Sequence, residues 1–248
     1  MRLQGKTAVV TGAGSGFGRG IAERFAAEGA FTVVADLNGD AAEAVAQGIG
    51  RQAVAVETDV ATDAGNAAMI DAALAHADRL DVLMLNAGTT HRNKPLLDVT
   101  VEEFDRITAV NMRAIYLATL RTVPLMAERG GGSIIVTAST AGLRPRPGLT
   151  WYNASKGWAI TATKSMAVEL ADRNIRVNCL CPVAGETGML AQFMGEDTPE
   201  LRETFKATIP LGRLSTPADM ASAALWLATD EAAFITGVAL EVDGGRCI

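Results

Sequence analysis

The chain has 248 residues, 49% of them hydrophobic, and a formal net charge of −6. This length permits one α/β domain with a sizeable core or two small domains, and the apolar content excludes a disordered chain. The mild acidity gives no reason to expect nucleic acid or an anionic membrane as a partner. No signal peptide and no run of 18 apolar residues is visible, so we expect a cytoplasmic protein.

Short apolar runs alternate along the chain with longer amphipathic stretches. The runs predict seven buried strands, at residues 7–10, 31–35, 53–56, 82–85, 133–136, 175–180 and 238–242. This alternation predicts a doubly wound, Rossmann-type parallel sheet with helices on both faces. No Pro-, Gly- or Ser-rich linker divides the chain, so residues 1–248 are expected to form a single domain.

Two helices carry start signals, and one long segment interrupts the alternation. Thr100 with Glu103 makes a capping box, and Thr216-Pro217 with Asp219 places a cap, a first-turn proline and an acidic residue at a second helix start. Residues 183–215 mix glycine, apolar and charged residues without a clear period. A segment of this length predicts a substrate lid at about 186–212.

The first strand ends in a glycine-rich turn that runs into a helix. Glycine lets the backbone approach a pyrophosphate, and a helix N-terminus supplies free N–H donors. The G-x-G-x-x-G spacing does not fit, whereas the wider T-G-x-x-x-G-x-G spacing, starting at Thr11, does. The turn therefore predicts a dinucleotide site, although a purely structural turn is the alternative. The predicted contacts are Gly12, Ser15, Gly16, Phe17 and Gly18.

Asp36 closes the second strand, where an acidic side chain can accept hydrogen bonds from the hydroxyls of an adenosine ribose. Its charge would repel a 2′-phosphate, and neither Ser15 nor Leu37 supplies a compensating cation. NAD is therefore favoured over NADP. The alternative is that Asp36 caps the next helix near Asn38.

The ends of the third and fourth strands are expected to complete the nucleotide site. Asp59 and Val60 are placed to meet the adenine edge, and Asn86, Ala87 and Gly88 could let the backbone pass close to the cofactor. Ordinary strand-end turns are the alternative for both segments.

Tyr152 and Lys156 lie four residues apart on one face of a predicted helix. A free tyrosine has a pKa of about 10, but a neighbouring ammonium and an oxidised nicotinamide would lower that pKa and allow acid/base catalysis. Such a pair alone is more often a solvated helix face. Ser139 closes the fifth strand, where ligands sit in open sheets, and Asn111 lies inside an otherwise regular helical stretch, where its amide can hold water.

Together these motifs resemble the short-chain dehydrogenase/reductase family, from about Lys6 to Gly245. The resemblance implies that Tyr152 exchanges a proton with the substrate oxygen and that Ser139 hydrogen-bonds this oxygen. It implies that Lys156 binds the nicotinamide ribose and lowers the tyrosine pKa, and that Asn111 holds a water of the proton relay. Hydride then moves between nicotinamide C4 and a carbinol or carbonyl carbon.

The resemblance also implies further cofactor contacts and an assembly. The backbone after the sixth strand is expected to meet the nicotinamide carboxamide, through Pro182, Val183, Gly185 and Thr187. Residues 242–245 are expected to make oligomer contacts, commonly in a homotetramer. Val183 stands where many relatives have glycine, and Leu85 where a second asparagine is frequent. Neither residue transfers a proton, so activity is still expected.

Substrate contacts are expected in residues 89–95, in residues 140–151 and in the lid. Apolar lid residues indicate a partly apolar pocket: Met189, Leu190, Phe193, Met194 and Phe205. Basic loop residues suggest an anionic substrate, with charges that simply face solvent as the alternative: His91, Arg92, Lys94, Arg144 and Arg146. Trp151 either lines the pocket or packs at the helix start.

The leading interpretation is an NAD(H)-dependent oxidoreductase that interconverts a secondary alcohol and a ketone, with a small molecule as its partner. One alternative is a 3-oxoacyl-[acyl-carrier-protein] reductase that uses NADPH and offers Arg129 and Arg173 to its carrier protein, although Asp36 argues against NADPH. A non-catalytic nucleotide-binding protein is the other alternative. The cysteines at 179, 181 and 247 form no even disulfide framework and have no suitably spaced His, so reduced thiols and no metal site are expected.

Overall fold

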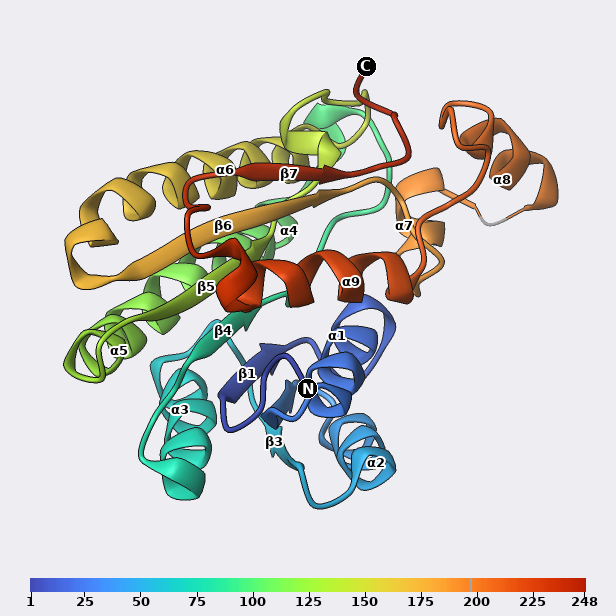
Figure 1. The fold of residues 1–248 in the computed structure, drawn as a ribbon. Helices are drawn as coiled ribbons and strands as arrows, with labels where there is room; N and C mark the ends of the chain where they lie inside the picture. Colours follow the sequence, from blue (N-terminus) through green and yellow to red (C-terminus); the bar gives the residue numbers. More distant parts are fainter. Residues whose placement is uncertain (197) are drawn as a thin grey trace.

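The computed structural model describes residues 1–196 and 198–248, and the strands in this part of the chain form one parallel sheet in the order β3-β2-β1-β4-β5-β6-β7 (Figure 1). The strands are β1 (Thr7–Thr11), β2 (Phe31–Asp36), β3 (Ala53–Glu57), β4 (Val82–Leu85), β5 (Gly132–Thr137), β6 (Ile175–Pro182) and β7 (Ala239–Val242). Each predicted apolar run overlaps one of them. The prediction of a doubly wound parallel sheet is confirmed.

Helices cover both faces of this sheet (Figure 1). They are α1 (Gly16–Ala27), α2 (Gly39–Ile49), α3 (Asp63–Ala77), α4 (Val101–Thr108), α5 (Ala114–Glu128), α6 (Thr150–Leu170), α7 (Leu190–Met194), α8 (Pro199–Lys206) and α9 (Pro217–Ala228). One face packs against α1, α2 and α9 through side chains such as Phe25 and Leu225, and the other against α3, α5 and α6 through Met69, Met126 and Ile160.

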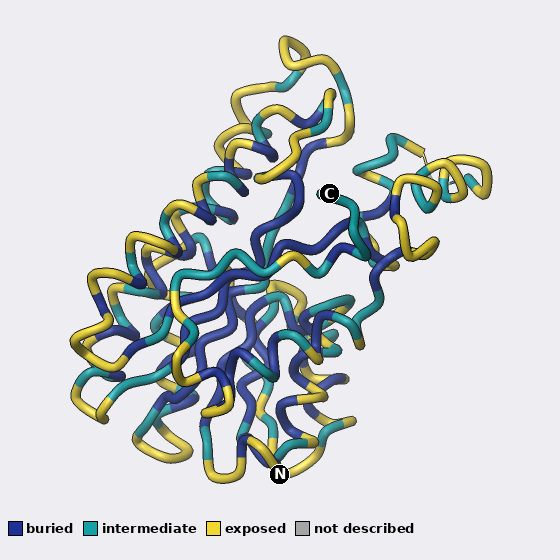
Figure 2. Tube along the Cα trace, turned by 45° about the horizontal axis from the view of Figure 1, so that its top comes forward, coloured by how far each residue is buried: buried dark blue, intermediate teal, exposed yellow. Residues whose placement is uncertain are grey.

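Burial follows the position of each strand in the sheet. The central strands β1 and β4 are buried along their whole length, whereas the edge strands β3 and β7 are not. A strand covered on both faces must be apolar throughout, which explains the continuous runs in the sequence. In Figure 2 the strands form a buried centre, and the helices are buried mainly on the side that faces it.

Both predicted helix starts have the expected caps. The Thr100 hydroxyl accepts from the N–H of Glu103, and the Glu103 carboxylate accepts from the N–H of Thr100 at 2.9 Å. Thr216 and Asp219 make the same reciprocal pair at the start of α9. These caps satisfy N–H groups that a helix leaves without internal partners.

The stretch around Asn111 is not a regular α-helix as predicted. Residues Ala109–Arg113 form a π-helical turn between α4 and α5. Such turns insert one extra residue and are frequent at functional sites. The prediction was wrong because the spacing of apolar residues indicates a helix but does not reveal that the Asn111 side chain hydrogen-bonds to the backbone of Thr89, outside the helix.

The segment after β6, in which a lid was predicted, contains the helices α7 and α8. A small apolar cluster of Val183, Leu190, Ile209 and Leu214 holds it together. Residue 197, within the predicted lid, lies outside the described residues. Across residues 1–196 and 198–248, no helix combines the length and the apolar character needed to cross a membrane.

Candidate active site

A cavity of about 600 Å³ lies at the carboxyl ends of the central strands. Ligands of open α/β sheets bind at this edge, because the loops that follow the strands surround it. Most of the predicted cofactor residues line the cavity: Gly12, Ser15, Gly16, Phe17, Asp36, Leu37, Asp59, Val60, Asn86, Ala87, Gly88, Tyr152, Lys156, Pro182, Val183, Gly185 and Thr187. Gly18 does not line it.

The glycine-rich turn needs its glycines for two different reasons. Gly12 and Gly16 have φ angles of +64° and +53°, a region that side chains disfavour. Gly18 has ordinary backbone angles, but a Cβ there would overlap the carbonyl oxygen of Gly12. Gly18 therefore lets α1 pack closely against the turn, and Gly12 and Gly16 shape the backbone that faces the cavity.

Asp36 is tied to the backbone on both sides of the cavity rim. Its Oδ2 accepts from the N–H of Gly14 at 2.8 Å, and its Oδ1 accepts from the N–H of Asn38 at 2.9 Å. The cap of α2 is Asn38, whose side chain accepts from the N–H of Ala41. Asp36 thus orients the cap rather than replacing it. A carboxylate offers about four acceptor positions, so it keeps capacity for a ligand hydroxyl.

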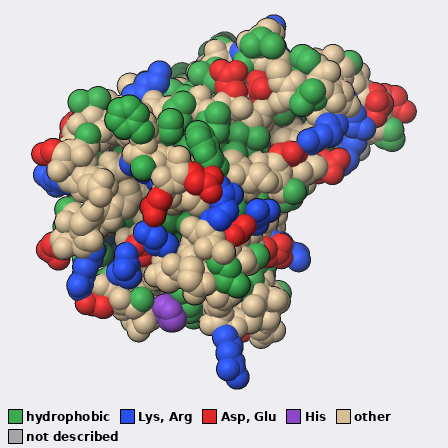
Figure 3. Space-filling model, in the orientation of Figure 1, with side chains coloured by type: hydrophobic (Ala, Val, Ile, Leu, Met, Phe, Trp, Pro, Cys, Tyr) green, Lys and Arg blue, Asp and Glu red, His purple; other side chains and the backbone are tan. Residues whose placement is uncertain are grey.

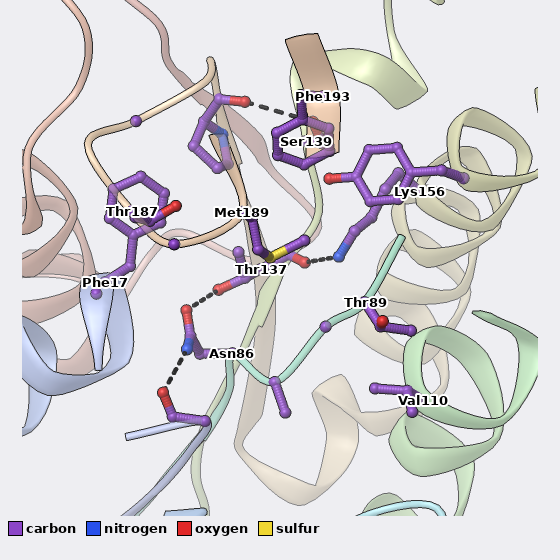
Figure 4. Close-up of a pocket in the computed structure, with 18 of the residues that line it drawn as sticks. Phe17, Asn86, Thr89, Val110, Thr137, Ser139, Lys156, Thr187, Met189 and Phe193 are labelled. Atoms are coloured by element: carbon purple, nitrogen blue, oxygen red, sulfur yellow. Dashed lines mark hydrogen bonds between the residues drawn. The ribbon is translucent and has the colours of Figure 1, made fainter. Parts of the chain in front are cut away.

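Asn86 fastens the ends of three strands together. Its Nδ2 donates to the carbonyl oxygen of Thr11 at 3.0 Å. Its Oδ1 accepts from the Thr137 hydroxyl at 3.1 Å (Figure 4). The Thr11 hydroxyl in turn accepts from the N–H of Ala87 at 3.0 Å. With its amide engaged in this way, Asn86 fixes the backbone of residues 86–88 along the cavity wall.

Lys156 is a buried cation, with only 4% of its surface exposed. Its Nζ donates to the carbonyl oxygen of Thr137 at 2.8 Å (Figure 4). Burial lowers the Lys156 pKa to about 8, since the charged form loses hydration, and the neighbouring thiols of Cys181 and Cys179 oppose that shift. Near neutral pH the ammonium is still the major form.

Tyr152 and Ser139 face the same cavity. Burial raises the pKa of the Tyr152 hydroxyl to about 12, while a hydrogen bond with Ser139 and the charge of Arg146 lower it. The Lys156 Nζ lies 5.7 Å from the centre of the tyrosine ring. In the free protein the Tyr152 pKa is thus raised and not lowered as expected, because desolvation of the phenol is the largest effect. The Ser139 Oγ accepts from the N–H of Ala141 at 3.1 Å.

Asn111 lies behind the cavity wall and does not line it. Its Nδ2 donates to the carbonyl oxygen of Thr89 and to the Ser155 hydroxyl, at 2.9 and 3.0 Å, and its Oδ1 accepts from the N–H of Thr89 at 2.8 Å. Ser155 donates onward to the carbonyl oxygen of Tyr152 at 2.7 Å. The π-helical turn is thereby joined to α6 at the residue that carries the phenol. Ser155 was not predicted as a site residue, although it lies beside Lys156 in the same motif.

The predicted substrate residues separate into two groups. Met189 and Phe193 line the cavity (Figure 4). The Phe193 ring lies 5.2 Å from that of Tyr152. His91, Arg144 and Trp151 do not line it. The ring of His91 is buried, Arg144 donates to the carbonyl oxygen of Arg246, and Trp151 packs edge-on against Phe104. Arg144 and Trp151 thus contact partners within the protein, and the Nδ1 of His91 lies 2.8 Å from the carbonyl oxygen of Arg92.

The basic residues predicted on the loops separate in the same way into residues with protein partners and one that lines the cavity. Lys94 pairs with Glu103 at 2.7 Å, and Arg92 donates to the carbonyl oxygen of Gly195 at 2.8 Å. Arg146 is the member of the cluster that lines the cavity. Thr89 and Leu149 also line it and fall within the segments predicted to contact substrate. Arg106 and Val110 line the cavity without a sequence signal, from α4 and the π-helical turn.

Comparison with known proteins agrees with this geometry. A family profile described as enoyl-(acyl carrier protein) reductase matches residues 12–246. The 4-formylbenzenesulfonate dehydrogenase of Comamonas testosteroni is 48% identical over the full length of both chains. A 3-ketoacyl-(acyl-carrier-protein) reductase from Brucella melitensis, solved with NADH, is 47% identical, with a TM-score of 0.94 over 99% of this chain and 100% of that one.

A short-chain type dehydrogenase/reductase from Mycobacterium marinum is also similar, at 32% identity and a TM-score of 0.90, over 98% of this chain and 96% of that one. The chain thus has the fold and the site of a nucleotide-dependent oxidoreductase that acts on CH–OH groups. It belongs to the short-chain dehydrogenase/reductase family.

Proposed function

We propose that the protein is an NAD(H)-dependent oxidoreductase that interconverts a secondary alcohol and a ketone, with Tyr152 as general acid/base. The observation that carries the proposal is one shared cavity. It brings Tyr152, Ser139 and Lys156 together with the glycine-rich turn and Asp36. A proton donor and a dinucleotide site on the same wall are what hydride transfer to a carbonyl requires.

The residues present fit a dinucleotide. The turn at Gly12–Gly16 exposes backbone to the cavity, and Asp36 keeps acceptor positions free for the ribose hydroxyls. A nicotinamide bound there supplies or accepts the hydride. Lys156 uses one of its three N–H donors on Thr137, which leaves two for the hydroxyls of the second ribose. Backbone at Val183 and Thr187 is available to the carboxamide.

The proton chemistry follows from the environment of Tyr152. With a pKa of about 12 in the free protein, its hydroxyl is protonated near neutral pH and can donate to a carbonyl oxygen during reduction. Ser139 hydrogen-bonds that oxygen. For oxidation the phenol must lose its proton, so the cations around it, Lys156 and the oxidised nicotinamide, have to lower its pKa. Asn111 would hold the water that carries the proton away.

NAD is preferred to NADP in this proposal because Asp36 places a negative charge where a 2′-phosphate would lie. The Brucella relative solved with NADH supports this preference. The name of the Comamonas relative supports a dehydrogenase of a small organic molecule.

A second candidate is a 3-oxoacyl-[acyl-carrier-protein] reductase, favoured by the name of the Brucella relative. Arg129, one of the two arginines that would meet a carrier protein, is half-exposed, and its charge is already paired with Asp78. A non-catalytic nucleotide-binding protein is the third candidate, and it would leave the whole Tyr, Ser and Lys set without a role.

The test is a panel of ketones and alcohols, followed by the absorbance of the reduced cofactor, with NAD(H) and NADP(H) in parallel. Tyr152→Phe keeps the ring and should bind NADH normally while losing about 10²- to 10⁴-fold in turnover. Undiminished turnover by this variant would sink the mechanism. A higher kcat/KM with NADPH than with NADH would overturn the cofactor assignment, and cofactor binding without any turnover would favour the non-catalytic candidate.

We also infer that residues 1–248 act as one domain, with the segment at 186–212 as its lid, and that the protein is a homotetramer. Two features support assembly. The edge strand β7 has sheet hydrogen bonds on one side, and hydrophobic side chains gather over it in Figure 3. Exposed apolar side chains on α5 and α6, such as Tyr116, Leu120 and Val168, offer a second contact surface. Light scattering tests the mass, and that of a single chain would refute this inference.

A further inference from the structure

Arg146 is an arginine of the cavity wall whose guanidinium has no hydrogen-bond acceptor among the described residues. Within residues 1–196 and 198–248, no carboxylate or carbonyl takes a hydrogen bond from its guanidinium, which instead stacks 3.9 Å above the Phe205 ring. Its backbone is held firmly, because the Asn153 Nδ2 donates to the Arg146 carbonyl oxygen at 2.7 Å. The cation is therefore fixed in place with its five N–H donors unused by the described residues.

The surroundings of this guanidinium are electropositive. Burial and the charge of Arg246 lower the Arg146 pKa to about 10, so the side chain remains charged near neutral pH at some cost. The Arg246 Nε is itself buried and has no partner in the described chain. An anion bound to such a guanidinium stabilises its charge strongly, because the guanidinium is partly desolvated and is repelled by a second one.

The cavity has no acidic lining residue near this end. Its acidic lining residues in the described chain, Asp36 and Asp59, follow β2 and β3, whereas Arg146 follows β5. Three strand spacings separate β2 from β5, which is about 14 Å. The loop that carries Arg146 therefore starts about 14 Å from the strand end that carries Asp36, and we do not expect Arg146 to bind an adenosine 2′-phosphate.

Arg146 does lie near the reacting groups. Both Arg146 and Tyr152 line the cavity, and the Arg146 charge lowers the Tyr152 pKa. An aromatic ring lies beside each of them, Phe193 at 5.2 Å from the Tyr152 ring and Phe205 at 3.9 Å from the Arg146 guanidinium. Flat rings on a lid and a planar guanidinium suit a flat apolar body that ends in an anionic group.

We propose that Arg146 is a specificity-determining residue that binds the carboxylate or sulfonate of a flat, apolar substrate while its carbonyl or carbinol lies at Ser139 and Tyr152. The proposal rests on the function proposed above, which it narrows to organic anions. It gives a role to the one of the loop arginines whose guanidinium has no acceptor in the part of the chain that the structure describes.

The first test is binding, which requires no turnover. Benzoate and benzenesulfonate are titrated by calorimetry, each in a separate experiment, into the protein saturated with NAD. We expect Arg146→Met to weaken binding by about 10- to 100-fold, because a charge-assisted hydrogen-bonded pair is lost. Arg146→Lys keeps the positive charge but not the planar group that makes two parallel hydrogen bonds, so its affinity for the anions should fall less. Arg144→Met is the matched control, because Arg144 lies two residues away and does not line the cavity.

The second test compares 4-acetylbenzoate with its neutral methyl ester in NADH-dependent reduction. The ratio of the two kcat/KM values should fall about 10- to 100-fold in Arg146→Met and stay as in the wild type in Arg144→Met. An equal loss on acid and ester would mean that Arg146 only supports Phe205 and the lid, and would overturn the proposal. So would a failure of both anions to bind the wild type, or unchanged binding to Arg146→Met.

The two levels of proposal can fail separately. If no ketone is reduced by any of the proteins but the anions bind through Arg146, the proposed function fails and the binding site stands. If the ester is reduced as well as the acid by the wild type, the oxidoreductase stands and the anion site is refuted.

Discussion

Lys156 should make the stability of the cofactor-free protein depend on pH in a way that one substitution removes. Its ammonium is buried beside the Thr137 carbonyl, and its pKa falls from the ordinary 10.5 to about 8. The unfolded chain binds this proton up to about pH 10.5, whereas the folded chain releases it near pH 8. Unfolding between these values takes up a proton, so raising the pH disfavours unfolding.

The size of the effect follows from the shift of about 2.5 pKa units. At 1.36 kcal/mol per unit, burying the charge costs the folded state about 3 kcal/mol below pH 8. About 2 kcal/mol of this cost disappears between pH 7.5 and 9.5. Lys156→Met has no such proton. The free energy of unfolding of the wild type should therefore rise by about 2 kcal/mol relative to that of the variant over this interval.

Urea unfolding followed by circular dichroism, at several pH values from 7.5 to 9.5, measures this difference. Contributions shared by the two proteins cancel, including those of the buried cysteines and of the tyrosines, which begin to ionise in the unfolded chain towards pH 9.5. Lys164→Met is the control, because Lys164 is exposed on the same helix and its charge keeps its hydration on folding. If the unfolding free energies of the wild type and Lys156→Met run parallel across this range, the reasoning about burial is wrong.

Three further predictions concern other parts of the protein. Gly18→Ala should destabilise the protein by about 1–3 kcal/mol, because its Cβ would overlap the glycine-rich turn. The control Gly48→Ala has open space around the new Cβ and should stabilise α2 by up to about 1 kcal/mol. Thermal unfolding measures both effects, and equal effects would refute the packing argument. Asn111→Leu leaves the N–H and carbonyl of Thr89 without that partner and should cost about 2–4 kcal/mol in chemical unfolding, so a fully stable variant would contradict the network. Asp36→Asn removes one negative charge and should raise the NADPH to NADH ratio of kcat/KM by roughly tenfold, while an unchanged ratio would show that the charge does not select the cofactor.

The sheet could be predicted from the sequence because its signals are local. Each buried parallel strand must be apolar on both faces, and each capped helix start carries its own hydroxyl and acid, as at Thr100 and Thr216. The strand carboxyl ends then place the motif residues on one edge. For this reason Gly12, Asp36, Ser139 and Tyr152 could be assigned to one site before their distances were known.

What the sequence could not predict depends on partners from distant segments. The direction in which a loop side chain points is decided by such contacts, so His91, Arg144 and Arg146 look equivalent in the sequence although only the last of these lines the cavity. The π-helical turn at Asn111 depends on a bond to Thr89, and the raised pKa of Tyr152 depends on burial by the folded lid and core. None of these partners is within a helical or strand period of the residue it affects.

The hydrogen bond from Gly14 to Asp36 has a consequence for the kinetics of cofactor capture. Because the carboxylate already holds the N–H of the glycine-rich turn, this part of the site has its binding shape before any nucleotide arrives. Little ordering entropy then remains to be lost there on association, and the adenosine half can dock without waiting for a slow rearrangement. We therefore expect the association rate constant for NADH to lie close to that of a preformed site.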